Sequence, residues 1–268
     1  MLRMSFLAGF TATALMVCTA DAQAANWSVT SPETSTCSPS DLLFAFKAYG
    51  SYTINNDVWS PCSGVAAGMQ TIWANSYLDW GVSSYQPKTD GIKSYPHIGY
   101  IVNKPMSSLK SLTATISATT PATTPTNGAA WESTFDIWAG NKKHEIMVWL
   151  KYTGSPDGCG DVKPISANWT STGCAIPREK GVKLSGATWN LYVGNNPNNQ
   201  VYSFLLASKL DNGTPDHATI DVLEFMKYLQ QKSYFDDLVI DEIQYGFEIT
   251  SSPGGLRFAS KNFDITAE

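Results

Sequence analysis

KHEIMVWL, at residues 143–150, is typical of a β-strand with one carboxylate near its middle. Side chains of a strand alternate between two faces, and one face here is wholly aliphatic, with Ile146, Val148 and Leu150. The other face carries Glu145 beside the apolar side chains of Met147 and Trp149. A carboxylate in such a setting is partly desolvated, which is costly unless the group has a partner or a chemical task. Taken alone, Glu145 has a simpler alternative interpretation as a solvated strand residue.

A second predicted strand near the C-terminus, IQYGFEIT at residues 243–250, repeats this arrangement. Its apolar face consists of Tyr245, Phe247 and Ile249. Glu248 stands on the polar face, and Gly246 beside it leaves room for a close approach to the strand. Cleavage of a glycosidic bond requires at least two carboxyl groups, such as these on neighbouring strands, because one attacks the sugar and the other protonates the leaving oxygen. Glu145 and Glu248 are therefore the strongest candidates in the chain for a catalytic pair.

The first 24 residues have the features of a secretory signal peptide. Arg3 precedes an apolar run from Phe6 to Val17, and small residues at alternate positions predict cleavage near 22–24. The run is too short to span a membrane, and no later segment approaches the required ~20 apolar residues. We therefore expect a protein that is secreted to the extracellular space and has no membrane association. Residues 25–268 are expected to form one domain, since about 240 residues is a common size for a single all-β domain.

The composition favours a neutral, ring-shaped ligand. The formal net charge is −5 and the chain has no basic cluster, which argues against nucleic acid or an anionic membrane as partner. Only 15% of the residues are charged, whereas 12% are aromatic and nine are Trp. Such rings stack on the faces of sugars, although aromatic residues also fill the cores of β proteins.

Four cysteines remain after cleavage, and an even number in an exported chain favours disulfides. They allow three pairings, of which we expect Cys37 with Cys62 and Cys159 with Cys174. The chain has no CxxC motif, and its three histidines are scattered, so a Cys/His metal site has little support. We expect no metal, no cofactor and a monomeric state.

Short alternating segments separated by turn residues make up most of the chain. The predicted strands are residues 42–53, 70–80, 97–102, 109–118, 131–138, 144–152, 188–193, 201–208, 238–250 and 261–266. Residues 219–229 instead have the i, i+3, i+4, i+7 apolar spacing of a helix, with Thr219 or Asp216 as its cap. The pattern predicts an all-β fold, an antiparallel β-sandwich of the jelly-roll type with one α-helix packed on its convex side; the resemblance described next implies that its two antiparallel sheets are curved.

Seven motifs, in order along the chain, resemble glycoside hydrolase family 12, the retaining endo-β-1,4-glucanases and xyloglucanases. They are NNDVW (55–59), KSYP (93–96), FDIW (135–138), EIMVWL (145–150), WNLY (189–192), VYSF (201–204) and QYGFE (244–248). The resemblance implies a jelly roll whose concave sheet forms an open cleft for a β-glucan chain. It also implies endo-β-1,4-glucanase activity, with cellulose, mixed-linkage glucan and xyloglucan as alternative substrates.

The resemblance assigns the nucleophile to Glu145, the general acid/base to Glu248, and an aspartate that hydrogen-bonds the nucleophile to Asp136. These roles imply a retaining double displacement, for which the two carboxyls lie ~5 to 5.5 Å apart. Asp136 is expected to share a proton with Glu145 or to orient it. The alternative for Asp136 is an exposed acid at a strand end.

Substrate positioning is expected from four side chains: Asn56, Trp59, Met147 and Trp149. The first two match the family's glycone-side site, and the other two lie on the nucleophile's own face. Four further tryptophans are left unsorted between cleft and core: Trp73, Trp80, Trp131 and Trp138. Tyr95 and Pro96 are expected to shape a loop at the edge of the cleft.

Two other functions compete with this hypothesis. A xylanase of a related jelly-roll family would share the fold and the two glutamates, and only the order of the motifs argues against it. A secreted, non-catalytic carbohydrate-binding protein would use the aromatic residues without chemistry. Paired glutamates in mid-strand disfavour such a binding protein, because binding alone does not need two carboxylates that face one bond.

Overall fold

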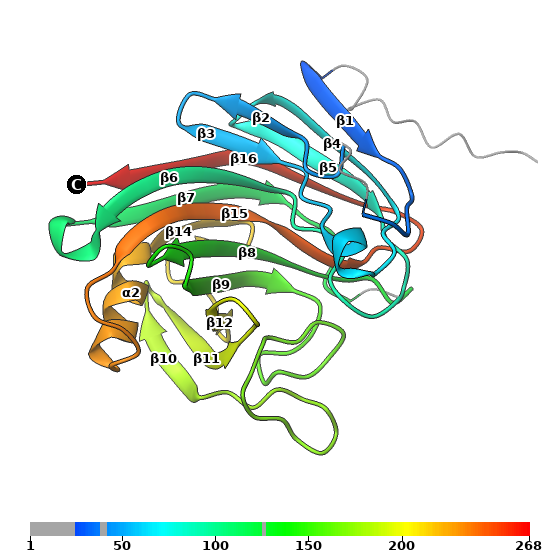
Figure 1. Cartoon of the computed structure of the whole chain (residues 1–268). Helices are drawn as coiled ribbons and strands as arrows, with labels where there is room; N and C mark the ends of the chain where they lie inside the picture. Colours follow the sequence, from blue (N-terminus) through cyan, green and yellow to red (C-terminus); the bar gives the residue numbers. More distant parts are fainter. Residues whose placement is uncertain (1–24, 38–41, 125–126) are drawn as a thin grey trace, which may run out of the picture.

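The computed structural model describes residues 25–37, 42–124 and 127–268, which fold into two stacked β-sheets and one α-helix (Figure 1). The strand order of the seven-stranded sheet is β1 (Trp27–Ser31), β4 (Met69–Ser76), β5 (Asp79–Tyr85), β16 (Leu256–Ala267), β7 (Leu112–Thr119), β14 (His217–Asp221) and β13 (Gly213–Thr214). The strand order of the nine-stranded sheet is β10 (Glu179–Leu184), β11 (Ala187–Asn195), β12 (Gln200–Leu206), β9 (His144–Tyr152), β8 (Ala130–Ala139), β15 (Val239–Ser251), β6 (His97–Pro105), β3 (Tyr52–Asn55) and β2 (Phe46–Tyr49). The predicted all-β sandwich is confirmed. The predicted signal peptide, residues 1–24, lies outside the described residues.

The main apolar core lies between the two sheets. Ile146 and Val148 of β9 are completely buried there, in one cluster with Ile72 and Val82 of the opposite sheet. The aliphatic face of the KHEIMVWL strand is thus the core face, as its alternation predicts. Glu145 consequently points away from the other sheet. We call this outward side of the nine-stranded sheet the carboxyl face.

Helix α2 (Val222–Gln231) begins three residues later than predicted. Asp221 is its cap and accepts a hydrogen bond from the backbone N–H of Glu224 at 3.0 Å. Thr219 belongs to β14 instead, so the predicted caps are wrong. Phe225 of α2 packs edge-on against Trp189 and Phe204, so the helix lies on the side of the nine-stranded sheet opposite the carboxyl face. Among the described residues, no helix has the length and apolarity that a membrane crossing requires.

The predicted strands differ from the observed ones mainly at turns and edges. Residues 42–53 and 70–80 were each predicted as one strand, but each contains a hairpin, β2–β3 and β4–β5. Gly50 makes the first of these turns with φ at 62°, a conformation that glycine adopts without strain. Strands β1, β10 and β13 were missed because they are sheet edges with few buried side chains, so they lack the apolar alternation of inner strands.

One strand pair departs from the expected antiparallel arrangement. Strands β9 and β12 are parallel, with Val201 paired to Glu145. The start of β12 therefore lies beside the start of β9. The turn that leads into β12, residues 196–199, is brought next to Glu145 by this pairing.

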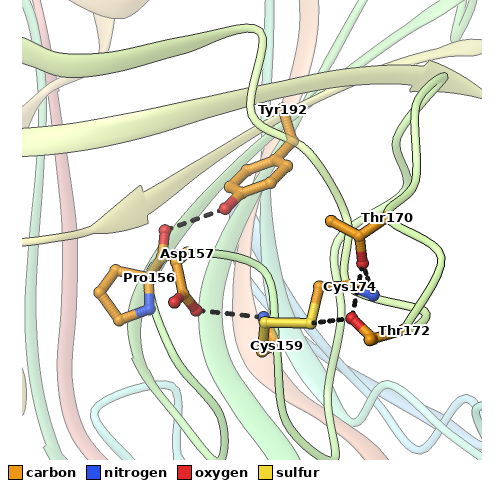
Figure 2. The surroundings of a disulfide bond; sticks show 7 residues. All are labelled: Pro156, Asp157, Cys159, Thr170, Thr172, Cys174 and Tyr192. Carbon is orange, nitrogen blue, oxygen red and sulfur yellow. Dashed lines mark hydrogen bonds between the residues drawn. A yellow bond between two sulfur atoms is a disulfide. The ribbon is translucent and has the colours of Figure 1, made fainter.

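Both expected disulfides are present, Cys37–Cys62 and Cys159–Cys174. The second closes the long segment between β9 and β10, which we call the stapled loop (residues 153–178; Figure 2). Tyr192 of β11 donates a hydrogen bond from its hydroxyl to the carbonyl oxygen of Pro156 in this loop at 2.9 Å. The stapled loop is thereby fixed to the sheet beneath it.

Candidate active site

Strand pairing places the candidate catalytic carboxyls along β8 and its two neighbours. Asp136 lies in the middle of β8. On one side of it along the strand, Glu145 of β9 is paired with Trp138. On the other side, Glu248 of β15 is paired with Glu132. The two glutamates thus flank Asp136 from opposite directions on the carboxyl face, and a molecule lying across the strands at Asp136 has one glutamate on each side.

Two amides from a single turn contact Glu145. The Nδ2 of Asn199 donates to the Oε2 of Glu145, and the Nδ2 of Asn196 lies 3.4 Å from the same oxygen. The turn is held by the Oδ1 of Asn196, which accepts from the backbone N–H groups of Asn198 and Asn199 at 2.9 and 3.0 Å. Burial raises the pKa of Glu145 to about 7, the hydrogen bond from Asn199 lowers it, and the charge of Glu248 raises it. The amides favour the ionised form that a nucleophile needs.

Glu248 faces a second carboxyl instead. Glu132 is fully buried directly opposite on β8, and its carboxyl faces that of Glu248. Burial raises the pKa of Glu248, the hydrogen bond with Glu132 lowers it, and the charge of Asp57 raises it. A net upward shift of this pKa retains the proton that a general acid must donate.

Asp136 is only 4% exposed, so the alternative of an exposed strand-end acid is wrong. Burial raises the pKa of Asp136 well above its usual range, and the charges of Glu145 and Glu248 raise it further. Its Oδ1 has no hydrogen-bond partner in the described part of the chain. Asn199 and Asn196 donate hydrogen bonds to Glu145, and the role of Asp136 beside Glu145 stays a prediction. The asparagine-rich turn NNPNN at 195–199 was the available sequence signal for these amides.

Asn56 does not lie on the carboxyl face. It is fully buried, its Nδ2 donates to the carbonyl oxygen of Leu42 at 2.8 Å, and its Oδ1 accepts from Gln70 at 3.0 Å. Its position therefore contradicts the predicted substrate contact. The next residue, Asp57, adopts φ of 41° and brings its Oδ2 within 3.9 Å of the Nδ1 of His97. Asp57 was missed because strand alternation does not continue through a left-handed residue.

Trp149 and Met147 lie under the stapled loop. Trp149 is 2% exposed and Met147 5% exposed, and both belong to an apolar cluster with Val162 and Ala175 of that loop. Trp149 therefore has no free face for a sugar in this structure, which corrects its predicted role. The sequence pattern places a side chain on a face of the sheet, but it does not show which loop covers that face.

Trp59 remains available as a candidate for sugar stacking. It is half-buried immediately before the short 3-10 helix η1 (Ser60–Ser63). Of the four unsorted tryptophans, Trp138 lies on the carboxyl face, where its Nε1 donates to Gln244 at 3.2 Å. Trp80 and Trp131 are completely buried in the core. Trp73 is on the outer face of the other sheet, beneath the ammonium of Lys261 at 5.5 Å.

The room beside Gly246 is taken by the protein itself. A Cβ at this position would lie 2.3 Å from the carbonyl oxygen of Pro96, so only glycine allows the segment before β6 to approach β15.

Tyr95, next to Pro96 in this segment, is buried, and its hydroxyl donates to the carbonyl oxygen of Thr134 at 3.3 Å. Burial raises the pKa of Tyr95 well above its usual range, and the charges of Asp136, Glu248 and Glu145 raise it further. Among the described residues, no group of three or more His, Cys, Asp or Glu side chains is arranged to hold a metal ion.

Comparison with known proteins identifies the family. Residues 50–268 match the profile of the family described as Glycosyl hydrolase family 12. Xyloglucan-specific endo-beta-1,4-glucanase A of Emericella nidulans is 29% identical over 231 residues, which cover 81% of this chain and 87% of that protein. The xyloglucanase domain of NopAA, a type three effector from Sinorhizobium fredii solved in complex with cellobiose, is 37% identical. That structure has a TM-score of 0.79, and the match covers 91% of this chain and 99% of that one.

A more distant structure shows the same fold. The catalytic domain of Humicola grisea Cel12A is 20% identical with a TM-score of 0.67, and the match covers 90% of this chain and 99% of that one. The resemblance seen in the seven motifs is confirmed by these matches, and it extends over most of the sandwich. The chain belongs to glycosyl hydrolase family 12 and is a glycoside hydrolase of the endoglucanase or xyloglucanase type.

Proposed function

We propose that the protein is a secreted, retaining endo-β-1,4-glucanase that cleaves the backbone of xyloglucan, with Glu145 as nucleophile and Glu248 as general acid/base. The observation that carries this proposal is the contrast between the two carboxyls. Amide groups donate to Glu145, whereas Glu248 faces the carboxyl of Glu132. The amides stabilise the ionised form of Glu145, whereas burial and the charge of Asp57 favour the protonated form of Glu248, and these are the two states that the first step requires.

In the first step, the carboxylate of Glu145 attacks the anomeric carbon and forms a glycosyl-enzyme. The C–O bond to the leaving sugar breaks, and Glu248 gives its proton to that oxygen. In the second step, the carboxylate of Glu248 takes a proton from a water molecule, whose oxygen attacks the same carbon and releases Glu145. Burial raises the pKa of Asp136 well above its usual range, which favours its neutral form and limits the negative charge beside the nucleophile.

Xyloglucan is the favoured substrate because the relatives described above include xyloglucan-specific enzymes and a xyloglucanase domain. Cellulose and mixed-linkage glucan share the same β-1,4-linked backbone and remain alternatives. Trp59 and Trp138, both half-buried, are the proposed stacking surfaces for sugar rings. Secretion is supported by the predicted signal peptide together with two disulfides, which persist in oxidising compartments.

The experiment that tests this function measures the release of reducing sugar from xyloglucan, barley β-glucan, carboxymethylcellulose and xylan in parallel. The purified protein and its Glu145→Gln variant are compared under the same conditions. We expect activity on xyloglucan, a β-configured first product by NMR, and loss of turnover in the variant. Activity on xylan alone would indicate a xylanase, and binding without turnover would indicate a carbohydrate-binding protein.

A further inference from the structure

Glu132 is a buried carboxyl to which the two-glutamate mechanism gives no role. It is completely buried in β8, and in the described part of the chain neither of its oxygens receives a hydrogen bond from an N–H or hydroxyl donor. The carboxyl that it faces is that of Glu248, directly opposite on β15 and close enough for a hydrogen bond between the two side chains. Two carboxylates cannot bond to each other, so this hydrogen bond requires a proton on one of them.

The surroundings of Glu132 decide where that proton lies. An ionised carboxylate is costly when it is buried without donors or a cation. The ammonium of Lys93, which is also completely buried, is already bonded to carbonyl oxygens, including that of Thr250 at 3.1 Å. Glu248 is half-buried and can accept donors from outside the protein, whereas Glu132 cannot. The proton of the pair is therefore favoured on Glu132.

We propose that Glu132 is a positioning residue that stays protonated and donates its O–H to one oxygen of Glu248, so that the other oxygen of Glu248 serves the leaving group. The proposal rests on the role of Glu248 proposed above. When Glu248 is protonated, Glu132 donates to its carbonyl oxygen. When Glu248 has given its proton to the leaving oxygen, the same bond becomes charge-assisted and stabilises the new carboxylate. Glu132 neither gains nor loses a proton in the cycle.

The directions of the two pKa shifts agree with this assignment. Burial raises the pKa of Glu132 well above its usual range, and the charge of Glu248 and their hydrogen bond raise it further. The same hydrogen bond lowers the pKa of Glu248. Other titratable groups around the pair belong to several elements: Asp57, Lys93, Tyr95, His97, Asp136 and Glu145. These groups stay the same when only position 132 is changed, so a shift between such variants reports on this hydrogen bond.

The test compares Glu132→Gln with Glu132→Met. Glutamine keeps a donor but cannot ionise, whereas methionine has a similar length and no donor. We expect Glu132→Gln to stay within about threefold of wild-type kcat, with the basic limb of the kcat/KM profile unmoved. We expect Glu132→Met to lose about tenfold or more in kcat, and its basic limb to move to higher pH, because ionised Glu248 has lost the bond that stabilised it. Glu179→Gln, on the edge strand β10, serves as the matched control with an unchanged profile.

Several outcomes would overturn the proposal. A wild-type pH profile of kcat/KM in Glu132→Met would show that the hydrogen bond between Glu132 and Glu248 has no effect on catalysis. An equal loss of kcat in Glu132→Met and Glu132→Gln would show that the donor at position 132 does not matter. A basic limb at lower pH in Glu132→Gln would mean that Glu132 is ionised in the wild type. Should Glu132→Met fail to fold, infrared difference spectra of wild type against Glu132→Gln still decide, since a protonated carboxyl band must vanish in the variant. Inactivity of the wild type on every glucan would refute the proposed function instead.

Discussion

Glu145 and Glu248 are the same side chain on the same face of one sheet, yet their neighbours are chemically opposite. Glu145 receives amide hydrogen bonds from the turn before β12. Glu248 faces a fully buried carboxyl on β8. An amide donates whatever the pH, whereas a carboxyl donates only while it keeps its own proton. The comparison teaches that the sheet fixes the positions of both glutamates, and that burial and the neighbouring side chains determine how far each pKa is shifted.

The largest expected effect is on turnover, and its dependence on the leaving group of the substrate distinguishes the roles of the two glutamates. Glu145→Gln should lose about 10⁴-fold or more in turnover on both xyloglucan and an aryl glycoside with a good leaving group, because no nucleophile remains. Glu248→Gln should lose roughly 10² to 10⁴-fold on xyloglucan. On the aryl glycoside the glycosidic bond breaks without an acid, so Glu248→Gln still forms the glycosyl-enzyme but lacks the base for its hydrolysis. Azide attacks the glycosyl-enzyme without a base and should therefore restore the turnover of this variant. Azide rescue of Glu145→Gln to the same retained product would contradict the assignment.

The second effect concerns stability at Glu145, the proposed nucleophile. Burial raises the pKa of Glu145 from its usual 4.5 to about 7 in the folded protein. The folded state therefore binds this proton more tightly, and that contribution to stability is complete below pH ~4.5 and lost as the pH rises through about 7. Glu145→Gln should then raise the free energy of unfolding by up to about 3 kcal/mol above that pH, and by little in acid. Urea unfolding at both pH values measures this, and an equal gain at both would contradict it.

The third effect tests the amides. Asn199→Ala removes a hydrogen bond that lowers the pKa of Glu145, so the pKa should rise and the acidic limb of the kcat/KM profile should move to higher pH. A shift of one unit corresponds to about tenfold lower activity on that limb. Asn198→Ala, in the same turn but exposed, is the control. A limb that moves equally in both variants would indicate a disturbed turn rather than a lost donor.

The smallest effect lies on the Glu248 side. The charge of Asp57 raises the pKa of Glu248, after burial and the Glu132 hydrogen bond in importance. Asp57→Asn should therefore move the basic limb slightly toward lower pH, by about half a unit or less. The pH profile of kcat/KM measures this shift. Movement toward higher pH would show that Asp57 acts on Glu248 in another way than by its charge.

Strand alternation was enough to predict the layers and the two glutamates. It identified the core faces of β9 and β15 and therefore the outward direction of Glu145 and Glu248. It did not reach Asp57, because a left-handed residue ends the alternation there, and Asn56, which was predicted from the family resemblance alone, is buried away from the carboxyl face. It also failed for Trp149, since the stapled loop that covers this ring is placed by long-range packing. The amide of Asn199 depends on a strand pairing that periodicity does not specify.

The parallel pairing of β9 with β12 has an evolutionary consequence. An antiparallel partner would have placed its preceding turn at the far end of β9, near Tyr152, and out of reach of Glu145. With the parallel partner, the residues that adjust the acidity of Glu145 belong to a short connection at the edge of the fold, where substitutions and insertions are tolerated best. Evolutionary substitutions in this connection can therefore change the pKa of Glu145 while the strands that carry Glu145 and Glu248 stay the same.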